Sequence, residues 1–539
     1  MTPVPVTTPD QTAEERRATI EKAELPKSIS DLLDQAAIDS GDKCLLNFFD
    51  DGITRTYSEV RSASMQAGAA LAELGIGKGT HVAVMLPNIL EMPIIWLALA
   101  RLGAVMVPVN IRYSPRELRY VIENSEATYL FIHNDLRSSI SGEMTDAMPS
   151  DRIFFIGGNT DFWHANVSHA DPGKCPVPAT DLDDLMNIQF TSGTTGFPKG
   201  CMLSHRYWLT AGIVNAWRDG RRFRRILSVT PFTYMDPQWL LLMAMFQRAT
   251  LFVGRRQSTS KFSKWLSQYK IEFCLFPEAV AKQPLAEHDN QNKVVRANIY
   301  GLRASAHAAL EKRYGLIARE AFGMTEIGSG MFMPMEAVEM VGSGSCGRPS
   351  PFRETRIVDE TGKDVADGEI GELLIKGPGI FQGYYRNAEA TMQSLKDGWF
   401  HTGDLFHKDA IGNHFIVGRK KDMIRRSGEN IACREVEGVL REIDEVVEAA
   451  LIPVPDPIRG EEVKAYIVLR DGIKPNDEII RGIFEFTGER LATFKIPRYL
   501  EFIPTMPHTT SLKIAKSELA AYRKDHRLGS FDRVDDVWR

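Results

Sequence analysis

The ten consecutive residues Thr191-Ser192-Gly193-Thr194-Thr195-Gly196-Phe197-Pro198-Lys199-Gly200 are the most informative segment of this chain. Their glycines let backbone N–H groups approach an anion closely. The threonine and serine hydroxyls add further donors, and Lys199 adds a positive charge on a long side chain. The segment lacks the Gly-Lys-Ser/Thr ending of a Walker A loop. We therefore expect a phosphate-binding loop of another kind.

Composition and charge set the class of protein. The chain has 539 residues, of which 43% are hydrophobic and 25% charged, and this mixture is typical of globular proteins. It excludes collagen-like, disordered and coiled-coil chains, and the length suffices to bury large cores. The net charge of −5 gives no whole-chain electrostatic signal for nucleic acid. We expect no nucleic-acid partner.

The cysteines and the apolar segments indicate the compartment. Six cysteines are scattered without a CxxC pair, which fits free thiols in a reducing environment. The N-terminal residues show no basic region followed by an apolar stretch, so we expect no signal peptide. The densest apolar region, 85–109, is interrupted by Asn88, Glu91 and Arg101. We therefore expect a cytoplasmic protein without a membrane span.

Alternating strand and helix patterns flank the phosphate-binding segment. Before it, the patterns predict helices over 60–74 and 91–101 and strands over 81–86, 104–109 and 128–132. Ser114-Pro115-Arg116-Glu117 is a capping box that starts another helix. After the segment, strands are predicted over 227–230, 250–253, 272–276 and 298–301. This succession predicts parallel sheets covered by helices.

The remaining regions differ in character. Residues 339–417 are rich in glycine, proline and short alternating strands, and the chain after Gly418 has the pattern of a small α+β unit. Residues 1–25 are polar, and we expect a loosely held arm. The arginines at 218, 221, 222, 224 and 225 are expected to form a solvated basic loop.

The phosphate-binding segment resembles that of the acyl-adenylate-forming superfamily, which includes acyl- and aryl-CoA ligases, peptide-synthetase adenylation domains and firefly luciferases. Further stretches match in the family's order, and the resemblance runs from about Thr56 to Leu519. The resemblance implies an α/β fold with a large N-terminal domain, residues 1–417, made of two parallel α/β halves and a β-rich subdomain at about 339–417. A hinge at 418–421 and a small mobile α+β C-terminal domain at 422–539 would follow.

The resemblance also implies which residues bind the nucleotide. In Ala321-Phe322-Gly323-Met324-Thr325-Glu326, Phe322 would stack on adenine, Thr325 would contact the α-phosphate and Glu326 would hold Mg²⁺. A hard cation on ATP does favour a carboxylate oxygen. In Trp399-Phe400-His401-Thr402-Gly403-Asp404, Asp404 would accept both ribose hydroxyls. Gly418-Arg419-Lys420-Lys421-Asp422 would supply a second ribose or phosphate contact, Arg419, and the hinge residue, Lys421.

Three more stretches complete the resemblance. Gly371-Glu372-Leu373 through Gly383-Tyr384-Tyr385 matches a structural segment, to which we assign no chemistry. Arg425-Arg426-Ser427-Gly428-Glu429-Asn430 resembles the loop of the pantetheine tunnel, where Gly428 would let the CoA arm pass. Arg425 or Arg426 would contact a CoA phosphate, or both would form a solvated basic face. Lys513 matches the family's mobile catalytic lysine, although Leu512 replaces the usual glycine and Lys516 is an alternative.

The acyl pocket departs most from the family pattern and looks closest to the carnitine-type CoA ligase branch. Tyr234, Asp236 and Trp239 would form a cage for a quaternary ammonium group. The alternative is that Asp236 and Pro237 are the N-cap and first residue of a helix. The second pocket segment comprises Leu302, Arg303, Ala304 and Ser305.

The activity implied by the resemblance is a two-step ligation. A small-molecule carboxylic acid and ATP would give acyl-AMP and pyrophosphate, and acyl-AMP and CoA would then give acyl-CoA and AMP, with ATP, Mg²⁺ and coenzyme A required. Two alternatives stay open: a stand-alone adenylating enzyme that loads a carrier protein or an amine, and a non-catalytic nucleotide-binding relative. The acid stays open among aromatic, branched, medium-chain and betaine-like acids, and so does a homodimer.

Overall fold

The computed structural model describes residues 6–140, 142–158, 161–191, 198–427, 429–509 and 513–539. The chain forms two compact units. The first unit comprises residues up to Thr191, Pro198–Thr355 and Ile375–Phe400, and the second contains Arg356–Leu374 and His401–Arg539. Each unit has sheets and apolar clusters of its own.

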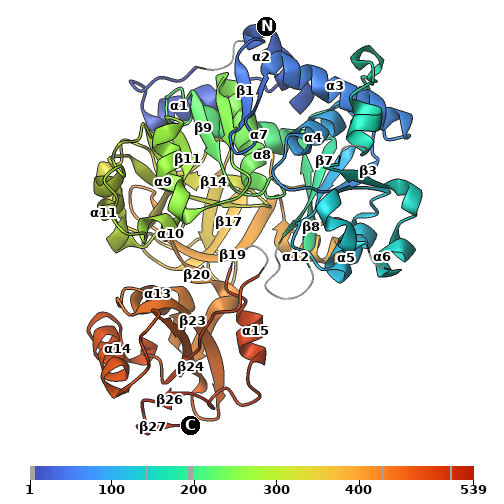
Figure 1. The fold of residues 1–539 in the computed structure, drawn as a ribbon. Coiled ribbons are helices and arrows are strands. Elements are labelled where there is room, and N and C mark those ends of the chain that lie inside the picture. The colour runs from blue at the N-terminus through green and yellow to red at the C-terminus, as the bar shows by residue number, and fades with distance from the viewer. Residues whose placement is uncertain (1–5, 141, 159–160, 192–197, 428, 510–512) are drawn as a thin grey trace. The chain divides into compact units, whose positions relative to one another are not determined.

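One sheet of the first unit is built mainly from strands that precede the phosphate-binding segment in the chain (Figure 1). Its strands lie in the order β6-β5-β3-β4-β7-β8, and all pair in parallel except β8, which is antiparallel to β7. The strands are β3 (His81–Met85), β4 (Val105–Pro108), β5 (Tyr129–His133), β6 (Ile153–Ile156), β7 (Leu185–Thr191) and β8 (Lys199–Ser204). The helices of this half are α3 (Tyr57–Glu73), α4 (Glu91–Leu102), α5 (Pro115–Ser125) and α6 (Gly142–Ala147). The capping box predicted at Ser114 is confirmed at the start of α5.

The other large sheet of this unit contains the parallel run β13-β12-β11-β9-β10-β1, with β2 antiparallel to β1 and β14 antiparallel to both β13 and β15. Its strands are β1 (Cys44–Phe48), β2 (Ile53–Thr56), β9 (Arg225–Ser228), β10 (Thr250–Val253), β11 (Phe273–Leu275), β12 (Arg296–Ile299), β13 (Ala318–Met324), β14 (Gly328–Phe332) and β15 (Ser345–Pro349). The remaining elements of the unit are α1 (Ala13–Glu21), α2 (Ile29–Ser40), α7 (His205–Trp217), α8 (Met235–Gln247), α9 (Thr259–Gln268), α10 (Glu278–Ala281), α11 (Ala304–Tyr314), α12 (Ala388–Ser394) and β18 (Leu395–Lys396). The predicted pair of parallel α/β halves is confirmed.

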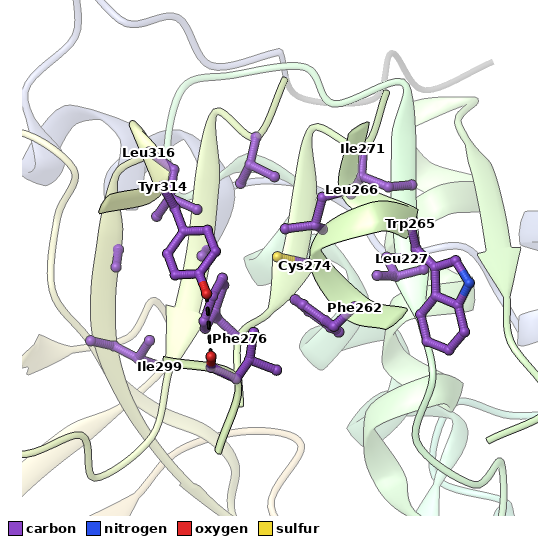
Figure 2. Close-up of a cluster of buried hydrophobic side chains, with 14 of the residues drawn as sticks. Leu227, Phe262, Trp265, Leu266, Ile271, Cys274, Phe276, Ile299, Tyr314 and Leu316 are labelled. Carbon is purple, nitrogen blue, oxygen red and sulfur yellow. Dashed lines mark hydrogen bonds between the residues drawn. The ribbon is translucent and has the colours of Figure 1, made fainter. Parts of the chain in front are cut away.

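An apolar cluster covers one face of the second sheet (Figure 2). Phe262 and Leu266 from α9 are fully buried in it together with Cys274 from β11. Tyr314, at the end of α11, is also buried, and its hydroxyl donates to the Val280 carbonyl at 3.2 Å. The phenol thus adds apolar area to the core without leaving a polar atom unsatisfied.

Helices α4, α7 and α8 are buried on almost every side. An all-round apolar helix of this kind is typical of the interior of a large protein. Helices α7 and α8 approach closely at Gly212, where an added Cβ would lie 2.7 Å from the Leu242 Cβ. In the described residues, no helix combines the length and the apolar character needed to cross a membrane.

The second unit holds most of the strands β16 (Glu354–Val358), β17 (Gly371–Lys376), β19 (Trp399–Lys408) and β20 (His414–Arg419), and a separate C-terminal sheet. The C-terminal sheet has the order β22-β21-β24-β25-β26-β27, with β23 paired to β24. Its strands are β21 (Met423–Arg426), β22 (Glu429–Ala432), β23 (Val446–Asp456), β24 (Gly460–Leu469), β25 (Tyr499–Phe502), β26 (Phe531–Asp532) and β27 (Val537–Trp538), and its helices are α13 (Cys433–Leu440), α14 (Asp477–Arg490) and α15 (Lys516–Ala521). The α+β pattern predicted after Gly418 is confirmed.

The expectation of a loosely held N-terminal arm is wrong for the described residues. Thr12 and Glu15 form a capping box that starts α1, and Arg16 and Ile20 of this helix are buried. The Arg16 guanidinium donates to the Arg218 carbonyl at 2.8 Å and pairs with Glu336 at 2.5 Å. The polar composition of this segment does not reveal that it is held in place, because a buried arginine can pack through its apolar stem while its guanidinium forms hydrogen bonds.

The expectation of a solvated basic loop is wrong for Arg218, which is 2% exposed. Its guanidinium donates to the Asn298 side chain at 2.9 Å and lies beside Asp219. Asp219 also pairs with Arg296 at 2.6 Å, and both of these side chains are buried. Burial lowers the pKa of Arg296 to about 9, and the neighbouring Asp219 carboxylate opposes this effect. Two buried guanidinium groups therefore share one carboxylate.

We predict that Asp219→Asn lowers the free energy of unfolding by about 3–5 kcal/mol, because it leaves two buried cations without that carboxylate. Urea denaturation followed by tryptophan fluorescence measures the change. Glu123→Gln is the matched control, since it breaks a pair with Arg119 in which both side chains are substantially exposed. The control should lose less than about 1 kcal/mol. Equal losses in the two variants would contradict a stabilising role for Asp219.

Candidate active site

Strands β7 and β8 place the two ends of the glycine-rich segment opposite each other. Thr191 ends β7, Lys199 begins β8, and the two residues are direct partners in the antiparallel ladder. The Lys199 side chain is exposed, and its Nζ lies 4.7 Å from the centre of the Tyr384 ring. The predicted phosphate contacts between them fall outside the described residues: Ser192, Gly193, Thr194, Thr195 and Gly196.

Glu326 lies in the turn between β13 and β14. Its side chain is buried, and its Oε1 accepts a hydrogen bond from the Tyr384 hydroxyl at 2.9 Å. At Gly323 an added Cβ would lie 2.6 Å from the Gly328 carbonyl oxygen, so the turn requires glycine at this position. The hairpin thus explains two elements of the motif, its glycine and its carboxylate.

The donor chemistry around Glu326 fits a cation that arrives with a nucleotide. Where the structure describes the chain, no group of three or more His, Cys, Asp or Glu side chains could enclose a metal ion. Mg²⁺ is usually held by one or two carboxylates together with substrate phosphates. A single carboxylate such as Glu326 fits this mode of binding. The described residues do not provide a metal site made of protein ligands alone.

Phe322 and Thr325, the other predicted residues of this motif, flank the same hairpin. Phe322 is on β13 beside a β-bulge and pairs with Met331 of β14. Thr325 follows β13 directly, and both side chains are partly exposed. The turn therefore brings an aromatic ring, a hydroxyl and a carboxylate together at one end of the sheet.

Asp236 is not an N-cap, so that alternative is wrong. Helix α8 begins at Met235 after Tyr234, which makes no side-chain cap, and Pro237 lies inside the first turn. The Asp236 Oδ1 instead accepts the indole N–H of Trp239 at 3.1 Å. Burial raises the pKa of Asp236, and the Trp239 hydrogen bond opposes this effect. Trp239 is 3% exposed, so we assign it to orienting the carboxylate, with no open ring face for a ligand.

A network of buried amides, which the sequence patterns did not reveal, holds the backbone before α8. Asn88 accepts the Phe232 N–H at 2.8 Å, Gln189 donates to the Thr233 carbonyl at 2.6 Å and Gln238 donates to the Tyr234 carbonyl at 3.1 Å. Buried amides with satisfied partners fix a unique backbone geometry. Tyr234 itself accepts a hydrogen bond from Asn110 at 3.1 Å.

The second pocket segment has its own anchors. The Glu320 carboxylate accepts the N–H groups of Gly301 and Leu302 at 3.0 and 2.9 Å. Leu302 is buried, and Arg303 pairs with Glu278 at 3.1 Å. Ala304 and Ser305 are exposed on the first turn of α11.

Asp404 and Arg419 are brought together in the second unit. They are direct partners between β19 and β20, and the Arg419 Nε donates to the Asp404 Oδ1 at 2.9 Å. Burial raises the pKa of Asp404, while the charges of Arg419, Arg434 and Lys513 act to lower it. Within this unit the buried Asp404 carboxylate therefore has positively charged side chains as neighbours.

Lys513 and Lys516 differ in their surroundings. Lys513 is exposed, whereas the Lys516 Nζ pairs with Glu437 of α13 at 2.7 Å and lies 3.9 Å from Asp422. Leu512 lies outside the described residues. These contacts make Lys516 part of the framework of the unit.

The hinge and CoA candidates also lie in the second unit. Lys421 is exposed in the short turn Lys420–Asp422 between β20 and β21. Arg426 is buried and pairs with Glu462 at 2.6 Å, which excludes a solvated face at this residue. Arg425 is exposed and lies 3.4 Å from Glu360, and Gly428 lies outside the described residues.

Known proteins resemble this chain along most of its length. A family model described as AMP-binding enzyme matches residues 33–385, and one described as AMP-binding enzyme C-terminal domain matches residues 435–513. Crotonobetaine/carnitine–CoA ligase of Proteus mirabilis (strain HI4320) is 31% identical over 484 residues, which cover 86% of this chain and 92% of that protein. The enzyme of the same name from Salmonella paratyphi A (strain ATCC 9150 / SARB42) is 30% identical over 520 residues, which cover 92% of this chain and 99% of that protein.

Solved structures also resemble this chain along most of its length. Anthranilate CoA ligase AuaEII in complex with anthranoyl-AMP matches with a TM-score of 0.84 and 25% identity, covering 93% of this chain and 98% of that chain. ATP-bound MatB from Rhodopseudomonas palustris matches with a TM-score of 0.83 and 25% identity. The match covers 92% of this chain and 99% of that chain. Together with the hairpin geometry and the two family models, these matches show that the chain belongs to the AMP-binding enzyme family.

Proposed function

We propose that this chain, an AMP-forming carboxylate–CoA ligase, activates a small carboxylic acid that carries a positive charge. In the first step the acid attacks the α-phosphate of ATP and gives acyl-AMP and pyrophosphate. In the second the CoA thiol attacks the acyl carbon and gives acyl-CoA and AMP. The charge of the acid is inferred from one observation, the partly buried carboxylate of Asp236.

Asp236 has no cationic partner among the residues that the structure describes. Its only hydrogen-bond donor found there is the neutral indole of Trp239. A partly buried carboxylate without a cationic partner is unfavourable, which is why burial raises the pKa of Asp236. A cationic group on the bound acid would compensate this charge. The relatives named above support the proposal, since the names of their substrates denote trimethylammonium acids.

The chain's own residues contribute positioning and charge. The carboxylate and the thiol of the substrates are the nucleophiles, so no nucleophile from the protein is needed. Cys201, next to the glycine-rich segment, is buried, and burial raises the pKa of its thiol, which disfavours the reactive thiolate. In this proposal Lys199 and Thr325 contact phosphate oxygens and Phe322 stacks on adenine. Glu326 would hold Mg²⁺, which would supply positive charge opposite the phosphates.

The second unit would complete the reaction. We assign Asp404 and Arg419 to the ribose, Lys513 to the adenylation step, Arg425 to a CoA phosphate and Lys421 to the hinge between domains 1–417 and 422–539. Release of pyrophosphate that depends on added acid separates this enzyme from a non-catalytic nucleotide binder. Thioester formation with free CoA separates it from an enzyme that loads a carrier protein.

Replacing Lys513 by alanine should impair adenylation by at least about a hundredfold, because a charge-assisted contact made mainly in the transition state is lost. The variant should still convert supplied acyl-AMP and CoA to thioester, which needs no cation at the departing phosphate. Quenched time-point assays of pyrophosphate release and of thioester formation measure adenylation and acyl transfer separately.

Lys516→Ala is the control for this comparison. It removes the pair with Glu437 and should lower the melting temperature while both reaction steps stay within a few-fold of the unmodified enzyme. If Lys516→Ala abolishes adenylation and Lys513→Ala does not, the assignment of the catalytic lysine is wrong.

Asp236→Asn should reduce kcat/KM for crotonobetaine at least about tenfold, since truncating one member of a buried charge pair is costly. Asparagine keeps an oxygen for the Trp239 N–H, so the pocket retains its shape. The matched substrate is 5,5-dimethylhex-2-enoic acid, in which a tert-butyl group replaces trimethylammonium. The neutral acid should not lose activity in the variant. Equal losses for both acids would contradict a role for charge.

The ratio of kcat/KM for crotonobetaine to that for the neutral acid should also depend on pH. The raised pKa of Asp236 means that lowering the pH protonates its carboxylate before an ordinary aspartate. The ratio should therefore rise with pH through this pKa and become constant above it. In Asp236→Asn the ratio should be independent of pH, and a pH-dependent ratio in that variant would exclude Asp236 as its origin.

A further inference from the structure

Residues 381–385 form a backbone bridge between the glycine-rich segment and Glu326. The Tyr385 N–H donates to the Gly200 carbonyl at 2.8 Å, and the Met202 N–H donates to the Gly383 carbonyl at 2.9 Å. At the other end, the Phe381 N–H donates to the Glu326 carbonyl at 2.8 Å. All of these residues belong to the first unit. The bridge therefore links β8, which begins at Lys199, to the turn that carries the carboxylate.

Tyr384, in the middle of this bridge, contacts both charged side chains. It is 7% exposed, and its backbone pairs with Cys201 of β8. Its hydroxyl donates to the Glu326 Oε1 at 2.9 Å, while its ring lies 4.7 Å from the Lys199 Nζ. One neutral side chain thus serves as donor to an anion and as π-face for a cation.

Tyr384 gives each of these opposite charges a neutral partner. Among the described residues Lys199 and Glu326 form no ion pair with each other: Glu326 accepts the Tyr384 hydroxyl, and the Lys199 ammonium faces the Tyr384 ring. A direct pair would have to break before the ammonium could meet phosphate and the carboxylate could meet a cation. Holding the two charges apart in advance is preorganisation, which reduces the reorganisation needed on binding.

We propose that Tyr384 is a positioning residue that keeps the Glu326 carboxylate and the Lys199 ammonium apart and ready for a magnesium–nucleotide complex. The inference rests on the functions proposed above for Glu326 and Lys199. Tyr384 itself contacts neither the reacting phosphorus atom nor the acid in this proposal. It acts through the two charged residues.

Calorimetric binding of α,β-methylene-ATP tests the proposal without turnover, because the bond that the enzyme breaks is replaced. Affinity is measured in MgCl₂ and in EDTA, and the ratio of the two is the magnesium enhancement. Glu326→Gln should abolish most of this enhancement. Tyr384→Phe should reduce it about tenfold, since it removes a hydrogen bond to a charged group. The double variant should bind no more weakly than Glu326→Gln alone, because Tyr384 acts through that carboxylate.

Comparison of Tyr384→Leu with Tyr384→Phe isolates the ring. Leucine removes the π-face as well as the hydroxyl, so affinity in EDTA should fall by a further two- to fivefold, roughly. This difference should vanish in a Lys199→Ala background. Tyr385→Phe is the matched control, because its hydroxyl bonds to Glu126 rather than to the site. The Tyr385→Phe variant should show the full magnesium enhancement.

The outcomes separate this inference from the proposed function. A full magnesium enhancement in Tyr384→Phe, together with its loss in Glu326→Gln, would overturn the positioning role and leave the metal assignment intact. A full enhancement in Glu326→Gln would overturn both. Additive losses in the double variant would show that Tyr384 does not act through Glu326. Matching melting temperatures among the variants exclude a general loss of structure as the cause.

Discussion

Charged groups that bind a highly charged nucleotide are most useful when they do not neutralise each other first. This constraint accounts for the neutral partners of Glu326 and Asp236. Charges in the framework meet opposite charges: Arg296 meets Asp219, and Arg426 meets Glu462. Two carboxylates of the candidate site meet neutral aromatic donors instead: Glu326 accepts from Tyr384, and Asp236 accepts from Trp239. Asp404 and Arg419 pair with each other, and in the proposed function this contact is exchanged for ribose hydroxyls.

The scaffold under these side chains is rigid for a physical reason. Helices α4, α7 and α8 are apolar nearly all round and can only be accommodated in the interior. Polar positions within this interior are connected by amides, such as the Trp96 indole N–H that donates to Asn187 at 3.0 Å and Asn187 that donates to Gln238 at 3.0 Å. Because Gln238 also contacts the backbone that precedes α8, the acyl segment is held by the same network that satisfies the core.

Much of the fold could be predicted from the sequence because periodicity and capping are local. The helix after Ser114 and the strand Thr250–Val253 have the predicted starts. Partners distant in sequence could not be predicted: nothing near Arg218 indicates Asn298, and nothing near Tyr384 indicates Glu326. The Asp-Pro dipeptide was misleading at α8 because proline is tolerated throughout a first helical turn, where N–H groups lack partners anyway. Motifs thus locate the charged residues of the site, whereas tertiary contacts decide what each charge faces.

The close approach of α7 and α8 at Gly212 has a consequence for which acids fit. Helix α7 follows directly from β8, whose first residue is Lys199, and the first turn of α8 carries Asp236. The tight contact of Gly212 with Leu242 leaves the two helices little freedom to slide or separate. The backbone of α8, and with it the position of Asp236, is therefore held firmly against α7. In the proposed function this position limits the length of the acid, because the positive end must reach Asp236 while the carboxylate reaches the α-phosphate.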